Sequence, residues 1–254
     1  MQILVTNDDG VHAPGIRHLA HALKEKFKNV VVVAPLEEKS TTGHSLTLHK
    51  PLRITEIDKN VYGVNGSPAD CVYLAIKKIM KKKPDFVISG INRGSNMGQD
   101  VYYSGTVSGA REACIMGIPS IAVSLSADAK ANSKPIKTLH FDSAAESSVQ
   151  LILRLVKQPL PHHTLMNLNV PNLPLGKIKG FKAGKQGFRY YGGKIIERVD
   201  HRGSPYFWIG GQYEGFKNES DTDCDVVAQG YAALTPLQLD STDYSFLREF
   251  EADK

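Results

Sequence analysis

The sequence predicts an α/β fold built on a mostly parallel sheet, and features near its start lead to this expectation. Residues 2–7 form an apolar segment of strand character, and Pro14-Gly15 then opens a helical pattern with Ile16, Leu19, Ala20, Leu23 and Phe27 on one face. The run Val30-Val31-Val32-Val33 follows, and such β-branched runs are typical of strands covered on both faces. A strand, a helix and a second strand in this order predict a right-handed βαβ unit.

Further elements follow in the same style up to about residue 170. Extended segments are expected at 46–57 and 60–65, and a helix is expected from Ser67-Pro68 to about Met80, because serine caps helices and proline suits their first position. A strand is expected at 84–89, a helix start at 102–113, a strand at 119–125, a helix at 139–156 and a strand at 166–170.

The residue pattern of the sequence changes after Leu165. Glycine and aromatic residues are mixed with alternating residues from Gly176 to Gly215, a pattern that indicates hairpins. Such hairpins need a surface to pack on, which is either another subunit or their own chain; both interpretations stay open here. A strand at 230–237 and a short amphipathic helix at 240–254 complete the chain.

Composition bounds the class of protein. The chain has 254 residues, enough for one large domain, with 41% hydrophobic and 22% charged residues, which is ordinary for a globular protein. The net charge of +5 fits a small anionic substrate, but no long basic stripe indicates nucleic acid; the one basic run, Lys81-Lys82-Lys83, suits a helix C-terminus.

The cysteines and the lack of long apolar runs argue against several further classes of protein. Cys71, Cys114 and Cys224 are widely spaced, which indicates neither a disulfide framework nor a zinc site, and Cys71 and Cys114 lie in helical patterns as expected core residues. The chain enters a strand at once and contains no long apolar run. We therefore expect a cytoplasmic protein without a membrane segment.

The turn Asn7-Asp8-Asp9-Gly10 follows the first strand directly. Two adjacent carboxylates at the end of a buried strand repel each other and lose hydration, and a divalent cation is the simplest compensation. A solvated turn is the competing interpretation, because Asp-Gly is common in turns.

Two further loops leave strands at the same expected edge of the sheet. Residues 35–45 carry Ser40, and the glycine-rich residues 90–98 carry Asn92 and Asn96. Ligands of open α/β sheets gather at this edge. Two carboxylates with neutral serine and asparagine oxygens suit Mg²⁺ or Mn²⁺, or Ca²⁺, and argue against zinc.

The segment Ser104-Gly105-Thr106 places hydroxyls and free backbone N–H groups at a helix start, which is either an anion site or a plain N-cap. A metal beside a bound phosphate polarises it, so the constellation predicts metal-assisted hydrolysis of a phosphate ester.

Long motifs in order along the chain resemble the SurE family of nucleotidases. These motifs are residues 7–10, Pro35 with the Ser40 loop, 64–70, 89–98, 103–112, 167–171, and 230–237. The resemblance covers nearly the whole chain, although residues 126–138 contribute nothing to it.

The resemblance implies a Rossmann-like three-layer core with an extended C-terminal β-hairpin region. Residues 1–160 would form the metal- and phosphate-binding core, and residues 161–254 would form the last core strands, the hairpins and a C-terminal helix used in oligomerisation. These two parts would make one catalytic domain overall. It implies a metal-dependent phosphatase of nucleoside 5′- and 3′-monophosphates that also trims short polyphosphate in some members, acting as a homodimer or a tetramer with exchanged tails. It implies catalytic residues Asp8, Asp9 and Asn96, metal ligands Asp8, Asp9, Ser40 and Asn92, and phosphate-binding residues Asn92, Asn96, Ser104, Gly105 and Thr106.

Rival interpretations stay open. An aspartyl-phosphate phosphatase would use Asp8 or Asp9 as the nucleophile, although adjacent carboxylates followed by glycine do not match the Asp-x-Asp pattern. A nucleotide sensor without turnover is a second rival, despite the absence of dinucleotide and P-loop glycine patterns. A third is an oligomeric scaffold with a structural metal. His12 and His44 are either acid–base partners or loop histidines without a catalytic task.

Overall fold

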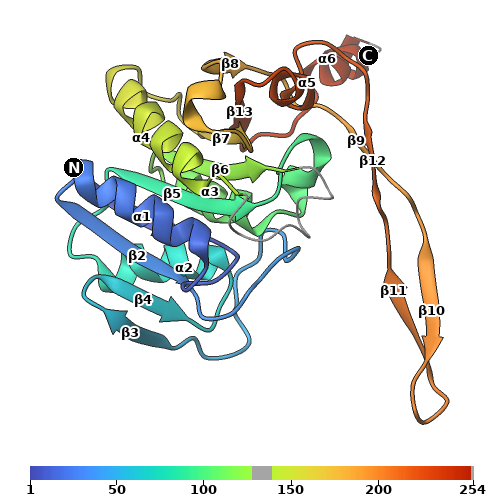
Figure 1. Cartoon of the computed structure of the whole chain (residues 1–254), viewed down its shortest axis with the longest axis horizontal. Helices are drawn as coiled ribbons and strands as arrows, with labels where there is room; N and C mark the ends of the chain where they lie inside the picture. The colour runs from blue at the N-terminus through green and yellow to red at the C-terminus, as the bar shows by residue number, and fades with distance from the viewer. Residues whose placement is uncertain (128–138, 253–254) are drawn as a thin grey trace.

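The structure is a computed structural model that describes residues 1–127 and 139–252 (Figure 1). Its strands have the following bounds: β1 Gln2–Thr6, β2 Asn29–Pro35, β3 Ile54–Asp58, β4 Val61–Val64, β5 Phe86–Arg93, β6 Ser120–Ser126, β7 Thr164–Pro171, β8 Phe181–Ala183, β9 Arg189–Tyr191, β10 Ile195–Val199, β11 Pro205–Ile209, β12 Tyr213–Phe216 and β13 Ala232–Gln238. Within the described ranges, nine of them form one sheet in the order β3-β4-β2-β1-β5-β6-β7-β13-β8.

Most neighbours in this sheet are parallel. Strand β1 pairs in parallel with β2 on one side and with β5 on the other, while β3–β4 and β7–β13 are the antiparallel pairs. From β1, the chain adds β2 and β4 on one side, and then adds β5, β6 and β7 on the other side, so the strand order reverses between β1 and β5. Ligand crevices of open α/β sheets lie at such a reversal, beyond the carboxyl ends of the strands.

Helices cover both faces of the sheet. The helices are α1 Pro14–Lys26, α2 Pro68–Leu74, α3 Gly105–Ile115, α4 Phe141–Lys157, α5 Asp223–Ala228 and α6 Tyr244–Ala252, with a π-helical turn η1 Ala75–Ile79 and 3₁₀ turns η2 Gly98–Tyr102 and η5 Leu175–Lys177. Helices α1 and α4 pack together on one face, and α2 and α3 pack together on the other (Figure 1). The expected three-layer α/β architecture is therefore confirmed.

Local sequence chemistry explains the helix starts. Pro14 begins α1, and the predicted cap Ser67 accepts a hydrogen bond from the backbone N–H of Asp70 while the Asp70 carboxylate accepts one from the Ser67 N–H, a reciprocal capping box. Cys71 and Cys114 are buried in α2 and α3, which confirms both as core residues.

Three expectations about elements were wrong. Residues 46–53 form no strand, because side-chain bonds from the start of α2 hold this segment, as in the two hydrogen bonds of Thr47 to Asp70. The helix α5 was not predicted; its cap, Thr222, accepts from the Asp225 N–H. Strand β8 lies parallel to β13 in the main sheet and is not part of a hairpin.

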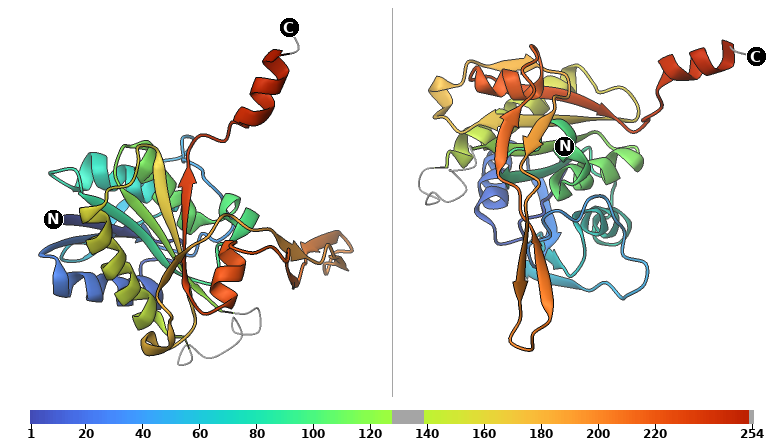
Figure 2. Two further views of the ribbon diagram at one scale, coloured as in Figure 1. Left: turned by 90° about the horizontal axis from the view of Figure 1, so that it is seen from above. Right: turned by 90° about the vertical axis from the view of Figure 1, so that its right-hand side faces the viewer.

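The remaining C-terminal strands form an arm that projects from the body (Figures 1 and 2). Strands β9 and β12 pair at its base and β10 and β11 pair farther out, both antiparallel, so hairpins are confirmed for this part of the region. The outer strands expose Ile195, Trp208 and Ile209. Helix α6 follows the last strand and also extends outward, and residues 253–254 of the expected helix lie outside the described residues. Among helices in the described ranges, none is long and apolar enough to cross a membrane.

Candidate active site

The turn after β1 has a fixed geometry. The Asn7 side-chain amide donates to the Gly10 carbonyl at 2.9 Å, and Gly10 has a φ of 101°, a conformation that favours glycine. The Val11 N–H donates to the Pro35 carbonyl at 2.8 Å, and the Lys39 N–H donates to the Asp8 carbonyl at 2.7 Å. The turn is thereby joined to the loop that carries Ser40.

Both aspartates in this turn are poorly placed to be anions without a cation. Asp8 is 4% exposed, and burial raises the pKa of its carboxyl, although hydrogen bonds from Thr106 counter part of this rise. Burial, together with the charge of Asp8, raises the pKa of Asp9 from its ordinary value to about 7. Glu38 adds further negative charge. A positively charged group bound beside Asp8 and Asp9 would therefore stabilise their ionised forms.

The oxygen donors around the turn suit a hard divalent cation. The Ser40 hydroxyl donates to Glu38 at 2.7 Å, which leaves its lone pairs free, and the Asn92 amide nitrogen donates to the Gly94 carbonyl at 3.0 Å, which leaves its side-chain oxygen as the available atom. No group of three or more His, Cys, Asp or Glu side chains in the described part of the chain could hold a metal. Two carboxylates with neutral oxygens thus fit Mg²⁺ or Mn²⁺ better than zinc.

The start of α3 lies against Asp8. Ser104 caps the helix and accepts from the Val107 N–H at 3.0 Å, while the Thr106 hydroxyl donates to Asp8 Oδ1 at 2.5 Å. A Cβ on Gly105 would be 2.7 Å from the Asp8 Cβ, so only glycine permits this approach. Gly105 and Thr106 are covered by the carboxylate, and their role in phosphate binding stays a prediction.

Asn96 is held by a buried amide network that sequence reasoning missed. Its backbone N–H donates to the Asn169 side chain at 3.0 Å, its carbonyl accepts from Asn167 at 2.8 Å and from Asn169 at 3.0 Å, and its own amide donates to Ser124 at 2.9 Å. Asn167 and Asn169 are alternate residues of β7 and therefore share one face of the sheet. Two asparagines at this spacing in an otherwise apolar strand are the signal that could have identified them.

A cavity of about 1070 Å³ brings most predicted site residues together. The predicted residues that line it are Asp8, Asp9, Ser40, Asn92, Asn96 and Ser104. Its other walls include Gln99, Asp100, Tyr103 and Tyr191, and the arm contributes Gly192–Gly193 and Ile209–Gly211. His12 and His44 do not line the cavity; the His44 ring instead pairs with Glu112 at 2.9 Å.

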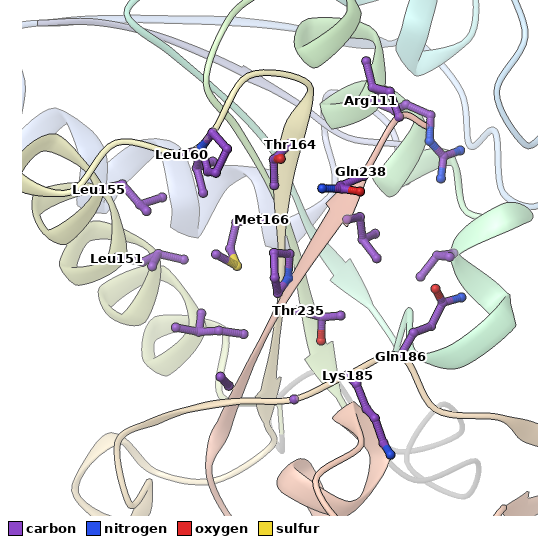
Figure 3. A pocket seen from close by; sticks show the side chains of 18 of the residues that line it. Arg111, Leu151, Leu155, Leu160, Thr164, Met166, Lys185, Gln186, Thr235 and Gln238 are labelled. Atoms are coloured by element: carbon purple, nitrogen blue, oxygen red, sulfur yellow. The ribbon is translucent and has the colours of Figure 1, made fainter. Parts of the chain in front are cut away.

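A second cavity, of about 1370 Å³, lies over β13 and β7 beside α4 (Figure 3). Leu155 and Met166 give it an apolar floor, and Arg111 and Lys185 lie on its walls. None of the predicted site residues lines it. The paired aspartates, the open oxygens and the capped helix belong to the smaller cavity, which is therefore the candidate active site.

Comparisons with known proteins agree with this geometry. The family model described as "Survival protein SurE" matches residues 3–193. Similar proteins include "5′-nucleotidase SurE" of Geobacter sulfurreducens, 48% identical with coverage of 97% of this chain and 91% of the relative, and that of Moorella thermoacetica, 46% identical with coverage of 99% and 95%. The crystal structure of SurE protein from Aquifex aeolicus aligns with a TM-score of 0.84 and 41% identity over 99% of each chain. The chain therefore belongs to the SurE family.

Proposed function

We propose that this protein is a divalent-metal-dependent phosphomonoesterase that hydrolyses nucleoside 5′-monophosphates to nucleoside and phosphate. Its substrates would also include 3′-monophosphates and short polyphosphate. The observation that carries the proposal is the carboxylate pair of buried Asp8 and partly buried Asp9, with raised pKa values beside the capped start of α3. The similar proteins named 5′-nucleotidase support this substrate class.

Asp8, Asp9, Ser40 and Asn92 would hold the cation, which is Mg²⁺ or Mn²⁺ in the proposal, with Ca²⁺ able to occupy the same site. When bound, the cation would polarise the phosphoryl group and supply a nucleophilic hydroxide. The raised pKa values support this assignment, because a cation would offset the repulsion between the two carboxylates.

The other residues would bind and orient the substrate. Asn96 would donate its side-chain amide to a phosphoryl oxygen, and the amide network from β7 would keep it in place at low entropic cost. Ser104 caps α3, so the positive N-terminal end of this helix would face the same anion. The cavity is large enough for a nucleoside, since pockets for such ligands are typically about 300–1,000 Å³. Tyr103 and Tyr191 on its walls offer aromatic faces for a base.

A phosphate-release assay tests the proposal directly. Purified protein would be assayed with AMP, 3′-AMP and a short polyphosphate in a titration of Mn²⁺ and Mg²⁺, with a chelated sample as control. We expect release from AMP only with metal, and restoration when metal is added back after chelation. An absence of release from every phosphomonoester at saturating metal would refute the function.

Two experiments separate the rivals. Beryllium fluoride bound to a nucleophilic aspartate mimics an aspartyl-phosphate. Its failure to bind at Asp8 or Asp9 would exclude that mechanism. A chelator that abolishes assembly and leaves hydrolysis unchanged would favour the scaffold.

The proposal extends to assembly and location. A homodimer or tetramer is supported by the exposed apolar side chains of the arm and of α6, such as Ile209, Trp208 and Phe246. The division into residues 1–160 and 161–254, and a cytoplasmic location, are also part of the proposal. Light scattering across a concentration series would determine the oligomeric state.

A further inference from the structure

The base of the arm contacts the backbone segment that joins two residues of the candidate site. The turn η2 connects the loop of Asn96 to the helix cap Ser104, and β9 packs against it. The arm leaves the body at this place (Figures 1 and 2). Any displacement of η2 would therefore move both polar groups that are proposed to meet the phosphate.

The Gln99 side chain is hydrogen-bonded to the backbone of Arg189. The Gln99 side-chain oxygen accepts from the Arg189 N–H at 2.9 Å, and its amide nitrogen donates to the Arg189 carbonyl at 2.6 Å. One side chain of η2 thus satisfies both backbone polar groups of a strand residue, in the way that a neighbouring strand would.

Arg189 and Asp100 form a charged contact at the same place. The guanidinium of Arg189 donates to Asp100 Oδ2, and the Tyr191 hydroxyl donates to the same oxygen at 2.5 Å. The two charged side chains are only 10% and 18% exposed, so water screens their attraction weakly. The guanidinium also lies over the Tyr213 ring, 4.3 Å from its centroid.

A second connection fixes the beginning of η2. The buried carboxylate of Asp223 accepts from the Gly98 N–H at 2.8 Å and from the Gly187 N–H at 3.0 Å. The Gln186 amide donates to the Gly98 carbonyl at 2.9 Å. A Cβ on Gly98 would be 2.9 Å from the Gly187 carbonyl oxygen, so the two backbones are in direct contact.

We propose that Arg189 is a positioning residue for the phosphate-binding groups, acting through Asp100 and η2, and that the arm base is therefore part of the active-site architecture as well as of any subunit interface. This inference rests on the proposed function. It distinguishes two halves of the site: the phosphate half at Asn96 and Ser104, whose backbone the arm base contacts through η2, and the metal half at Asp8 and Asp9, which follows β1 and is joined to the loop after β2.

The test compares Arg189→Met with the matched control Lys217→Met. Lys217 also belongs to the arm region and pairs with Glu219 at 3.0 Å, but its side chain is 59% exposed. The inhibition constant of inorganic phosphate, the Mn²⁺ concentration for half activation and the melting temperature would be measured for both variants in the full-length protein.

For Arg189→Met we expect the phosphate inhibition constant to rise by about tenfold, because a desolvated charge-assisted contact is lost. The half-activating Mn²⁺ concentration should stay within about twofold, because the turn that carries Asp8 and Asp9 is also held by its hydrogen bonds with Pro35 and Lys39. For Lys217→Met all values should stay within about twofold, since exposed ion pairs contribute little.

A phosphate constant for Arg189→Met within twofold of the wild type would overturn the inference, and so would an equal shift of the phosphate and metal constants. If Arg189→Met fails to fold, Tyr191→Phe removes one hydrogen bond to Asp100; we expect a phosphate constant about threefold higher with unchanged Mn²⁺ activation, and an unchanged constant overturns the inference. A wild-type protein that hydrolyses no phosphomonoester refutes the proposed function, whereas an active wild type with insensitive variants refutes only this inference.

Discussion

Replacement of Asp9 by asparagine should remove activity and stabilise the metal-free fold. The increase in the pKa of Asp9 from 3.8 to about 7 corresponds to an unfavourable free energy of about 4 kcal/mol when the folded state carries the ionised group. Asp9 is only partly buried, so water screens some of this cost, and we expect about 1–2 kcal/mol in practice. In a chain of this size, that gain raises the melting temperature by roughly 3–6 °C.

The sign of the pH dependence follows from the same values. The pKa in the folded state lies above that in the unfolded state, so the penalty is fully present above pH 7 and decreases as the pH falls through that value. About a third of it remains at pH 5, because the unfolded chain is still ionised there. The advantage of Asp9→Asn should therefore be largest at pH 8 and small at pH 5.

Thermal denaturation in a chelating buffer at pH 8 and pH 5 measures this effect, with Glu56→Gln on the exposed strand β3 as the control for loss of one negative charge. With saturating Mn²⁺, turnover of Asp9→Asn should fall by about 100-fold or more, because one of two anionic ligands is gone. A variant that melts below the wild type at pH 8 without metal, or that turns over near the wild-type rate, would refute the reasoning.

Three further predictions concern the surroundings of the carboxylates and of Asn96. Thr106→Val removes the hydroxyl that donates to Asp8 and should raise the half-activating Mn²⁺ concentration about fivefold, whereas Thr106→Ser should not; equal values for the two variants would count against this role. Asn169→Ala removes two hydrogen bonds that hold the loop after β5 and should lower kcat/KM for AMP about tenfold, with a far-ultraviolet circular dichroism spectrum like that of the wild type. Gly105→Ala forces a methyl group against Asp8 and should lower activity by about 100-fold, while Gly176→Ala, which has open space around it, should be neutral in the same assay.

Several features of the fold could be predicted because they depend on nearby residues. The Val30–Val33 run predicted a strand buried on both faces, and the capping chemistry of Ser67-Pro68 predicted the start of α2. Residues 46–53 were wrongly expected to be extended, since their conformation depends on side-chain bonds to α2, more than 20 positions away. The six-residue α5 was missed because one turn and a half carries too little periodicity to detect.

The sequence by itself determined most of the succession of strands and helices along the chain, the tight turn at Asn7–Gly10 and the presence of oxygen donors near the ends of three strands, because each of these depends on residues within a few positions of one another. Only the tertiary structure decided how these pieces meet. The Thr106 hydroxyl lies on Asp8, Asn169 holds Asn96, and the arm holds η2 through Arg189, across separations of 98, 73 and 89 positions. Such contacts depend on strand order, on register and on the packing of α3 against the sheet, and no local pattern in the chain encodes them.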